Sequence, residues 1–286
     1  MSHDVINNTR TLVAFGATGQ QGGSLVYYVR KDHSSLYHIQ AVTRDPSKQS
    51  AQNLKFNNVE ALQADGHDTA SLRRVMHGAY MAFAMTLPKF DSEDARVREI
   101  AQGRAIADAA FEKGISCGKY QRVDHFDAKA EVELYMYDLP IRSIFYSPGW
   151  FMQNFNRHLA PRQNADGTWS IVNIVTPQTS LPLINQFEEM GKFLAPVLVG
   201  PKKFAGQTLS SAERFYSYQG IVQSMSNVWG ECGAVFGERL VEMMLYFEEY
   251  GYYGPQGKQE VDRMAKIATG DLTTFDEYLA RNPLRS

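Results

Sequence analysis

The sequence predicts an α/β protein with a doubly wound parallel sheet and a smaller C-terminal α+β domain. From Thr11 onward, short runs rich in apolar and β-branched residues alternate with longer runs of helical periodicity. A glycine-rich stretch, FGATGQQGG, directly follows the first apolar run and opens a helical one. Beyond Asn154 the alternation weakens, and prolines and glycines become frequent. Together these observations are typical of a Rossmann sheet followed by a second domain.

The elements of the first half follow one another in a regular order. We expect strands at TLVAF, HIQAVT and VEALQAD, and a buried central strand at AYMAFAMT because this run is almost continuously apolar. Helices are expected at GQQGGSLVYYVRK, at TASLRRVMHG with Thr69 as the N-cap, and from Asp91 to Gly114. A helix, HFDAKAEVELYMYDL, and a strand, IRSIFYSPGWF, complete this half of the chain.

One central strand is apparently missing after Gly114. Only Ile115, Ser116 and Cys117 precede GKY, whereas a strand usually takes about five or six residues. A gene model with skipped or misplaced exons, a splice form, or a tolerated trimming of the fold would each explain the gap. We favour the first two, because losing a central strand leaves neighbouring strand edges unpaired.

Composition and charge exclude several classes of protein. The formal net charge is -2 with the two signs interspersed, so no direct nucleic-acid or membrane partner is indicated. The two cysteines and seven histidines have no metal-ligand spacing, so no metal site is expected. No hydrolase elbow of the G-x-S-x-G type is present. A polar N-terminus and the lack of a long apolar run lead us to expect a soluble, cytoplasmic protein.

The glycine-rich stretch has the spacing and context of a dinucleotide phosphate loop. Gly16 permits a tight turn, Gly19 lets the backbone approach a pyrophosphate, and Gly22 allows close packing of helix and sheet. The N-terminus of the following helix favours negative charge. The alternative is an inherited loop that binds nothing.

Because the strand–helix alternation weakens beyond Asn154, we divide the chain into an NAD(P)-binding domain, residues 1–155, and a smaller substrate or partner domain, residues 156–286.

The residues after the second strand favour NADP(H) over NAD(H). Thr43 and Arg44 stand where an acidic residue would hold the ribose hydroxyls of NAD, and Lys48 is close by. A guanidinium at this point can pair with a 2′-phosphate. Two alternatives stay open: Arg44 is a solvated surface residue, or Asp45 serves a ribose.

Six segments carry a resemblance to a known family: VAFGATGQQGGSLV, AVTRDPSK, ALQADGHDTASL, HFDAKAEVELY, SPGWFMQNF and GYYG. In this order, and over roughly Thr11 to Leu279, they resemble the NmrA-like family of atypical short-chain dehydrogenase/reductases. The resemblance implies a cofactor in the cleft of a Rossmann domain. It implies cofactor contacts from Gly16, Ala17, Thr18, Gly19, Gln20, Gln21, Gly22, Arg44, Lys48, Asp65, Gly66, Thr86, Leu87, Lys129, Phe151, Met152, Gln153 and Asn154.

His125 and Lys129 are the candidate catalytic residues. They are four apart on one expected helix and so share a face. The family resemblance implies that they occupy the Tyr-x-x-x-Lys positions of ordinary short-chain dehydrogenases, where the lysine holds the nicotinamide ribose. Histidine can donate a proton near neutral pH. The favoured alternative is that His125 caps or packs, while Lys129 still holds cofactor.

The chain departs from the family pattern at two places. The family's strand after the long helix commonly ends in a serine at the nicotinamide end of the cleft, and Ser116 comes too early to take that role. A second shortening is expected in VWGECGAVFGERLVEMM, where Gly230, Gly233 and Gly237 crowd a segment too short for the family's strand and loop.

Two functions remain open. The first is an NADP(H)-dependent oxidoreductase acting on a small carbonyl, quinone or enone-type metabolite, and the resemblance implies a place in fungal secondary metabolism. The second is a non-catalytic dinucleotide-sensing regulator that docks onto a protein partner such as a transcription factor, which would allow a nuclear location. Aromatic residues such as Trp150 and Phe151 could line a substrate pocket, although aromatics at such spacings more often form core.

Overall fold

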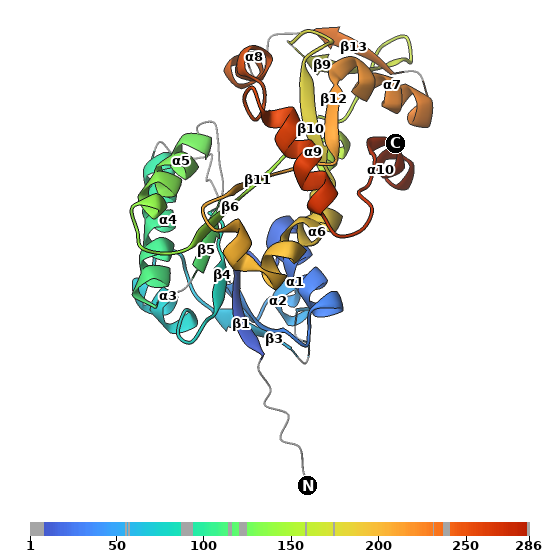
Figure 1. The fold of residues 1–286 in the computed structure, drawn as a ribbon. Helices are drawn as coiled ribbons and strands as arrows, with labels where there is room; N and C mark the ends of the chain where they lie inside the picture. Colours follow the sequence, from blue (N-terminus) through green and yellow to red (C-terminus); the bar gives the residue numbers. More distant parts are fainter. Residues whose placement is uncertain are drawn as a thin grey trace. The chain divides into compact units, whose positions relative to one another are not determined.

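The computed structural model divides the chain into two compact units (Figure 1). The first contains residues 1–146 and 197–208, and the second contains 147–196 and 209–286. The structure describes residues 9–54, 56, 58–86, 94–113, 116–119, 125–157, 159–173, 175–230, 232–236 and 241–284. The assignment of nucleotide binding to 1–155 and of substrate or partner binding to 156–286 stays a prediction.

The first unit is built on the predicted parallel sheet. The strand order of this sheet is β11-β6-β5-β4-β1-β2-β3, and the six strands β6-β5-β4-β1-β2-β3 follow the doubly wound order. Only the first residue of β11, Thr208, is counted in the first unit. The five pairings between neighbours among those six strands are all parallel. The strands are β1 (Arg10–Phe15), β2 (Tyr37–Thr43), β3 (Val59–Gln63), β4 (Met81–Phe83), β5 (Ser116–Lys119), β6 (Ser143–Pro148) and β11 (Thr208–Ser211). The Rossmann prediction is confirmed.

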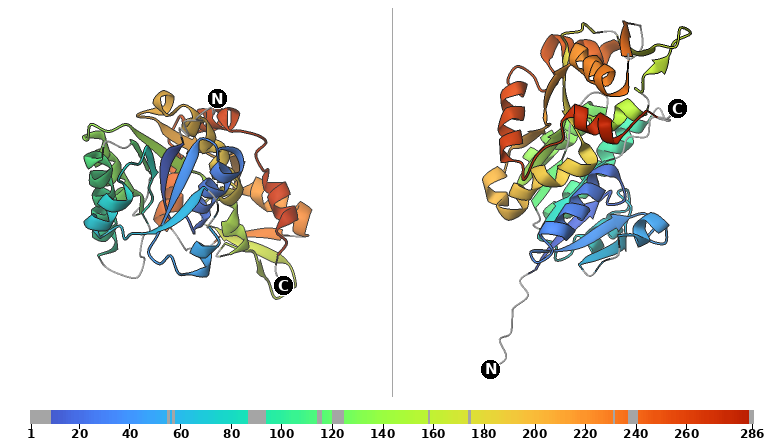
Figure 2. Two further views of the ribbon diagram at one scale, coloured as in Figure 1. Left: turned by 90° about the horizontal axis from the view of Figure 1, so that it is seen from below. Right: turned by 90° about the vertical axis from the view of Figure 1, so that its right-hand side faces the viewer.

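Helices cover both faces of this sheet (Figure 1, Figure 2). A row of α3, α4 and α5 lies on one face, and α1 lies on the other. The bounds are α1 (Gln20–Asp32), α2 (Gln49–Gln52), α3 (Thr69–Val75), α4 (Ala95–Glu112) and α5 (His125–Tyr137). The prediction that Thr69 caps α3 is wrong: the N-cap is Asp68, whose carboxylate accepts a hydrogen bond from the Ala70 N–H at 3.0 Å.

The prediction that a central strand is missing after Gly114 is also wrong. A short strand, β5, pairs in parallel with β4 on one side and with β6 on the other. Its four residues are fewer than the usual strand length. Two neighbouring strands supply hydrogen-bond partners on both sides of β5, so even a short strand leaves the edges of β4 and β6 paired.

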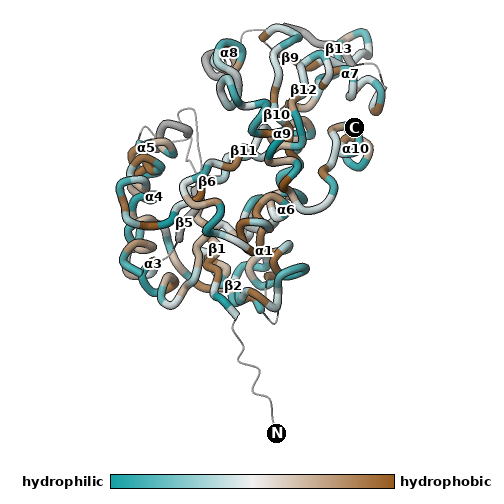
Figure 3. The backbone as a smooth tube through the Cα atoms, in the orientation of Figure 1, coloured by the Kyte–Doolittle hydropathy of each residue, from teal (hydrophilic) through white to brown (hydrophobic). Residues whose placement is uncertain are grey.

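The core of the first unit follows from the apolar strand runs that the sequence shows. Leu12, Val13 and Ala14 of β1 are at most 1% exposed, and β2 contributes the fully buried Ile39. Hydrophobic stretches along the sheet strands are visible in Figure 3. Because β1 lies in the middle of the sheet and is buried on both faces, it reads as a continuous apolar run and not as an alternating one.

The second unit is smaller and mixes α and β elements, as predicted. It holds two three-stranded sheets, with the orders β12-β10-β7 and β13-β9-β8. The strands are β7 (Trp150–Phe151), β8 (Arg162–Gln163), β9 (Trp169–Asn173), β10 (Ser180–Ile184), β12 (Arg214–Ser217) and β13 (Cys232–Phe236). The helices are η1 (Met152–Asn156), α6 (Gln186–Val199), α7 (Tyr218–Trp229), α8 (Val241–Tyr250), α9 (Gly257–Ile267) and α10 (Phe275–Arg281); α6 ends in the first unit, where η2 (Pro201–Phe204) follows.

The second expected shortening is also corrected in part. The segment around Gly233 does form a strand, β13, which pairs in parallel with β9 over five residues. Gly230 ends α7 with a φ of +95°, a conformation that residues other than glycine rarely adopt. Gly237 lies outside the described residues.

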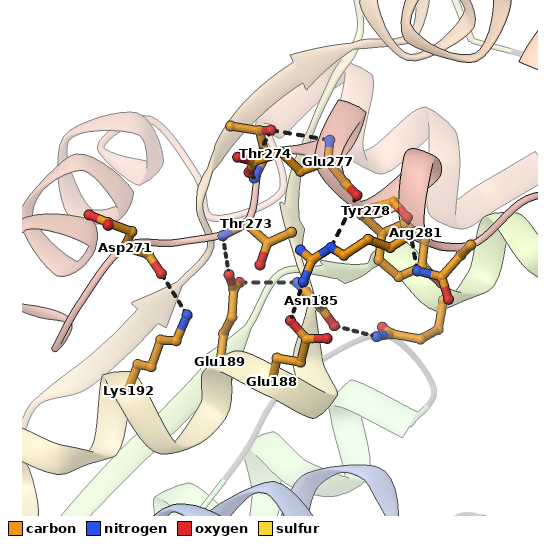
Figure 4. Close-up of polar contacts among 12 residues, drawn as sticks. Asn185, Glu188, Glu189, Lys192, Asp271, Thr273, Thr274, Glu277, Tyr278 and Arg281 are labelled. Atoms are coloured by element: carbon orange, nitrogen blue, oxygen red, sulfur yellow. Dashed lines mark hydrogen bonds and ion pairs between the residues drawn. The ribbon is translucent and has the colours of Figure 1, made fainter. Parts of the chain in front are cut away.

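The start of α6 is tied to the segment before α10 by a buried carboxylate (Figure 4). Glu189 accepts hydrogen bonds from the backbone N–H groups of Asn185 and Thr273. Burial raises the pKa of Glu189 to about 7, although both N–H bonds favour the ionised form. Around it, Lys192 donates to the Asp271 carbonyl at 2.5 Å. This network fixes the C-terminal segment within the second unit.

Candidate dinucleotide site

The glycine loop makes a tight turn between β1 and α1. Gly16 has a φ of +64°, and the Gly19 N–H donates to the Gly16 carbonyl at 2.9 Å. A Cβ atom at Gly22 would lie 2.6 Å from the Gly16 carbonyl carbon and 2.8 Å from the Ala17 nitrogen. Real Cβ atoms do not approach backbone this closely, so only glycine lets α1 pack directly onto the turn.

The N-terminus of α1 is suited to an anion. Its N-cap, Gly19, supplies no side-chain hydrogen bond, and no acidic residue lies in the first turn formed by Gln20, Gln21 and Gly22. The first-turn N–H groups of a helix have no partner within the helix, and the helix dipole adds positive potential there. Thr18 and Gly19 are exposed at this end. The backbone here fits a pyrophosphate.

The loops after β1 and β4 meet at the point where the strand order reverses. Met85 follows β4, and its sulfur lies 2.5 Å from where a Cβ of Gly16 would be placed. Open α/β sheets bind ligands outside the strand carboxyl ends at such a switch point. The predicted site residues Thr86 and Gly16 are therefore brought to one edge of the first unit by the topology alone.

Arg44 and Asp45 differ sharply in their surroundings. Arg44 follows β2, is exposed, and makes no ion pair with a carboxylate of the described residues. One oxygen of Asp45, by contrast, accepts from the backbone N–H of Ser47 at 2.9 Å and from its hydroxyl at 2.5 Å. These bonds, led by the hydroxyl, lower the pKa of Asp45. The Asp45 carboxylate thus stabilises a local turn, while the Arg44 guanidinium has no competing partner there.

Other predicted residues on this unit have mainly local roles in the structure. The Asp65 carboxylate accepts a hydrogen bond from the His67 N–H at 2.9 Å, and the backbone N–H of Asp65 donates to the Ser71 hydroxyl oxygen. A Cβ at Gly66 would lie 2.6 Å from the Cγ atom of Gln102 on α4. Lys48 is exposed and forms the N-cap position of α2. Their contacts with a nucleotide stay a prediction.

Lys129 is held by a buried network that the sequence did not reveal. Its ammonium donates to the Glu99 Oε1 atom at 2.5 Å, and the Thr86 hydroxyl donates to the same oxygen at 2.6 Å. The Glu99 side chain is 2% exposed and that of Lys129 is 12% exposed. The network therefore places the Lys129 ammonium beside Thr86, just beyond the end of β4.

A signal for Glu99 was nevertheless present in the sequence. Glu99 precedes the small and apolar residues that α4 buries against the unit by four, seven, eight and eleven positions, a helical spacing; these residues are Gly103, Ile106, Ala107 and Ala110. A carboxylate on the buried face of a helix needs a cationic or hydrogen-bonding partner. That mismatch between pattern and residue type points to a functional or paired glutamate.

Two predicted residues have no described side chain. His125 is the first residue of α5, one helical turn before Lys129, but its imidazole lies outside the described structure. Leu87 lies outside the described residues altogether. The catalytic assignment of His125 and the cofactor contact of Leu87 stay predictions.

The predicted Phe151–Asn154 stretch belongs to the second unit. Phe151 ends β7, and the 3₁₀ helix η1 follows. Met152 is completely buried, and the Gln153 amide donates to the Asn185 side-chain oxygen at 2.7 Å. The Asn154 carbonyl accepts from Leu159 at 3.0 Å. The half-buried Trp150 packs its ring edge-on against Phe247, with centroids 6.3 Å apart.

Among the described residues, no group of three or more histidine, cysteine or acidic side chains could hold a metal ion. In the same part of the chain, no helix has the length and apolar character needed to cross a membrane.

The comparison with protein families identifies this arrangement. Residues 8–279 match the model of the NmrA-like family. The chain belongs to that family. An NmrA-like family domain-containing protein of Dictyostelium discoideum is 25% identical over 307 aligned positions, which cover 96% of this chain and 98% of the relative. The alignment is longer than the 286-residue chain, so this relative has segments that are absent here.

Two further proteins are similar to this chain over most of its length. The NmrA-like oxidoreductase ptmS of Penicillium ochrochloron is 23% identical over 91% of this chain and 84% of its own length. The crystal structure of NmrA, a negative transcriptional regulator, superimposes with a TM-score of 0.82 at 21% identity, covering 96% of this chain and 95% of NmrA. NmrA has also been crystallised with NADP and with NAD. This likeness shows the fold.

Proposed function

We propose that this member of the NmrA-like family binds NADP(H) and acts as an oxidoreductase on a small carbonyl, quinone or enone-type metabolite. The observation that carries the proposal is the arrangement after β1 and β2. A phosphate loop with an uncapped helix behind it lies beside an exposed arginine. The acidic neighbour of that arginine, Asp45, already accepts two hydrogen bonds from Ser47.

Each cofactor group has a partner of matching chemistry in the first unit. The backbone N–H groups at the start of α1 would hold the pyrophosphate. Arg44, with Lys48 nearby, would take the 2′-phosphate, which favours NADP(H) over NAD(H). Lys129, fixed by Glu99, would donate to a ribose hydroxyl. NmrA, which shares this fold, forms complexes with NADP and with NAD, in line with a dinucleotide site whose preference depends on local residues.

The bound dinucleotide would supply the hydride. Reduction of a carbonyl consumes one hydride and one proton, and the protein provides orientation and a route for that proton. His125, one turn before Lys129 on α5, is the proposed proton donor. The name of ptmS as an oxidoreductase supports redox chemistry for the family. A role in fungal secondary metabolism stays a prediction.

Ligand titrations of the purified chain test this proposal. A ligand that binds only the folded state raises the unfolding temperature, so NADP+, NADPH, NAD+ and NADH can be ranked directly. We expect the NADP(H) pair to stabilise most and the Arg44→Ala variant to lose about tenfold or more in NADP+ affinity, as for a lost charge-assisted bond. An NADP+ affinity unchanged in Arg44→Ala would contradict the assignment.

A matched control separates a specific contact from a change in net charge. Lys31 is an exposed basic residue in the last turn of α1. Because α1 runs back along the sheet, that turn lies at the edge opposite the strand carboxyl ends. Lys31→Ala should leave the affinity for NADP+ within about twofold, since a surface charge far from the phosphates is screened.

The second candidate function is a non-catalytic dinucleotide sensor. The likeness to NmrA, described as a negative transcriptional regulator, favours it. So does the histidine at the position where ordinary short-chain dehydrogenases have their tyrosine. Oxidation of NADPH by a panel of aldehydes, quinones and enones would support the enzyme. Tight NADP(H) binding with no turnover of any panel member, together with partner binding that depends on the redox state, would support the sensor.

A further inference from the structure

The buried carboxylate of Glu99 has a role that neither the glycine loop nor the His-x-x-x-Lys spacing requires. Glu99 lies on α4 and is 3% exposed as a residue. Both of its described side-chain partners, Thr86 and Lys129, bond to one oxygen, Oε1. All three residues belong to the first unit. Thr86 and Lys129 were predicted to contact the cofactor, and Glu99 links the two because both donate to its carboxylate.

Burial distinguishes the Glu99–Lys129 ion pair from the exposed ion pair that also joins α4 and α5. Arg96 on α4 pairs with Glu131 on α5 at 2.5 Å, but their side chains are 51% and 39% exposed. Surface pairs of this kind contribute little. Removing one partner of a buried pair leaves an uncompensated charge and is much more damaging. Glu99 and Lys129 therefore constrain each other's position far more strongly than Arg96 and Glu131 do.

The network also sets which hydrogen-bonding groups face a ligand. A threonine hydroxyl has one proton, and Thr86 gives it to Glu99. Toward any ligand, Thr86 Oγ1 is then an acceptor. Lys129 is a donor only, and its charge is balanced by the adjacent carboxylate. An acceptor beside a charge-balanced donor suits hydroxyl groups, which both donate and accept, better than it suits a phosphate.

We infer that Glu99 is the positioning residue of the dinucleotide site, which directs Lys129 and Thr86 toward the hydroxyls of the nicotinamide ribose. This inference rests on the proposed NADP(H) binding. Lys129 acts there as a hydrogen-bond donor whose charge Glu99 balances, and not as a counter-ion for phosphate. Glu99 thus helps to fix the orientation of the flexible lysine stem beside β4.

Binding of two ligands to the Glu99→Gln variant tests the inference. Glutamine keeps the size and one acceptor oxygen for Thr86 but removes the charge that holds Lys129. NADP+ contains both riboses, whereas 2′,5′-ADP contains only the adenosine half with its two phosphates. We expect Glu99→Gln to weaken NADP+ binding about tenfold and to leave 2′,5′-ADP binding within about twofold, since only one ribose loses its contact.

A matched control and a double variant keep the result specific. Glu131→Gln removes the exposed pair between the same two helices, and it should change neither affinity. Lys129→Met should weaken NADP+ binding as Glu99→Gln does, and the double variant should be no weaker than Lys129→Met alone, because Glu99 acts through Lys129. The double variant removes both charges, so it should also remain folded if a single variant unfolds.

The outcomes separate this inference from the proposed function. If the wild-type chain binds NADP+ and 2′,5′-ADP but Glu99→Gln weakens both equally or neither, the inference is wrong and NADP(H) binding stands. An additive further loss of NADP+ affinity in the double variant also overturns it. If the wild-type chain binds neither ligand, the proposed function fails and the inference fails with it.

Discussion

Gly22 offers the sharpest steric test of the glycine loop. In Gly22→Ala the new Cβ would lie 2.6 Å from the Gly16 carbonyl carbon and 2.8 Å from the Ala17 nitrogen. Both atoms belong to the backbone of a tight turn, so neither can move as a flexible side chain would. Either α1 shifts away from the turn or the turn opens. Both changes disturb the N–H groups that we assign to the pyrophosphate.

The neighbouring glycine provides a control with the same chemical change. A Cβ at Gly23 would lie 3.4 Å from the Ala17 carbonyl oxygen, an ordinary contact. Both positions lie in α1, where alanine is favoured over glycine by about 1 kcal/mol. Gly23→Ala should therefore stabilise the folded chain by up to that amount. In Gly22→Ala, overpacking of about 1–3 kcal/mol offsets the gain and makes the net change destabilising or, at best, neutral.

Thermal unfolding and NADP+ titration measure the two effects separately. For a domain of this size, 1 kcal/mol corresponds to roughly 2–4 °C in the unfolding temperature. We expect the unfolding temperature of Gly23→Ala to rise by up to that interval, and its NADP+ affinity to stay unchanged. Gly22→Ala should be less stable than Gly23→Ala and should bind NADP+ at least about tenfold more weakly, because misplaced N–H groups lose charge-assisted bonds. Equal stability and equal affinity in the two variants would refute the steric argument.

Two further predictions concern residues outside the loop. Asp68→Ala removes the N-cap of α3 and should lower the free energy of unfolding by about 1 kcal/mol, as measured by chemical denaturation. Thr69→Ala should cause a smaller loss of stability. The reverse ranking of the two variants would contradict the assignment of Asp68 as the N-cap. Glu189 has its pKa raised by burial from 4.5 to about 7, so the folded state holds its proton more tightly and the free energy of unfolding should fall as pH rises between these values. The wild-type chain should lose roughly 3 kcal/mol relative to Glu189→Gln over that interval, and parallel pH profiles would show that Glu189 is ionised throughout.

The strands and the phosphate loop could be predicted because their signals are local. The burial of β1 on both faces produces a continuous apolar run, and Gly16, Gly19 and Gly22 stand immediately after it. In each case the information lies within about ten consecutive residues. A tight turn with a positive φ at Gly16 excludes most other residue types, so sequence and geometry correspond closely there.

Strand β5 could not be predicted because its stability comes from its neighbours. Ser116–Lys119 has neither the length nor the apolar pattern of a central strand. Its hydrogen bonds are made with β4, more than thirty positions earlier, and with β6, over twenty positions later. Local β-propensity predicts strand formation poorly where two flanking strands supply hydrogen-bond partners on both sides. The same reasoning applies to β13, which the glycine content of its segment argued against.

Glu99 was missed for a related reason. Its partners are 13 and 30 residues away in the sequence, and no short motif links the three. What the sequence did contain was a conflict, an acidic residue on the face of α4 that is otherwise small and apolar. Conflicts between pattern and residue type are expected where function competes with packing.

The predicted cofactor-binding residues of the two units differ in whether their side chains already have partners within their own unit. In the first unit, Arg44 has no described ion pair, and the first turn of α1 has no side-chain cap. In the second unit, Met152 is fully buried and Gln153 donates its amide to Asn185. A contact from the Met152 side chain would require that side chain to leave its packing, which would create a cavity. A nucleotide contact from this stretch should therefore involve Phe151 and Asn154, so alanine at Asn154 is expected to affect NADP+ affinity more than Met152→Leu does, and the opposite order would show that η1 repacks when ligand binds.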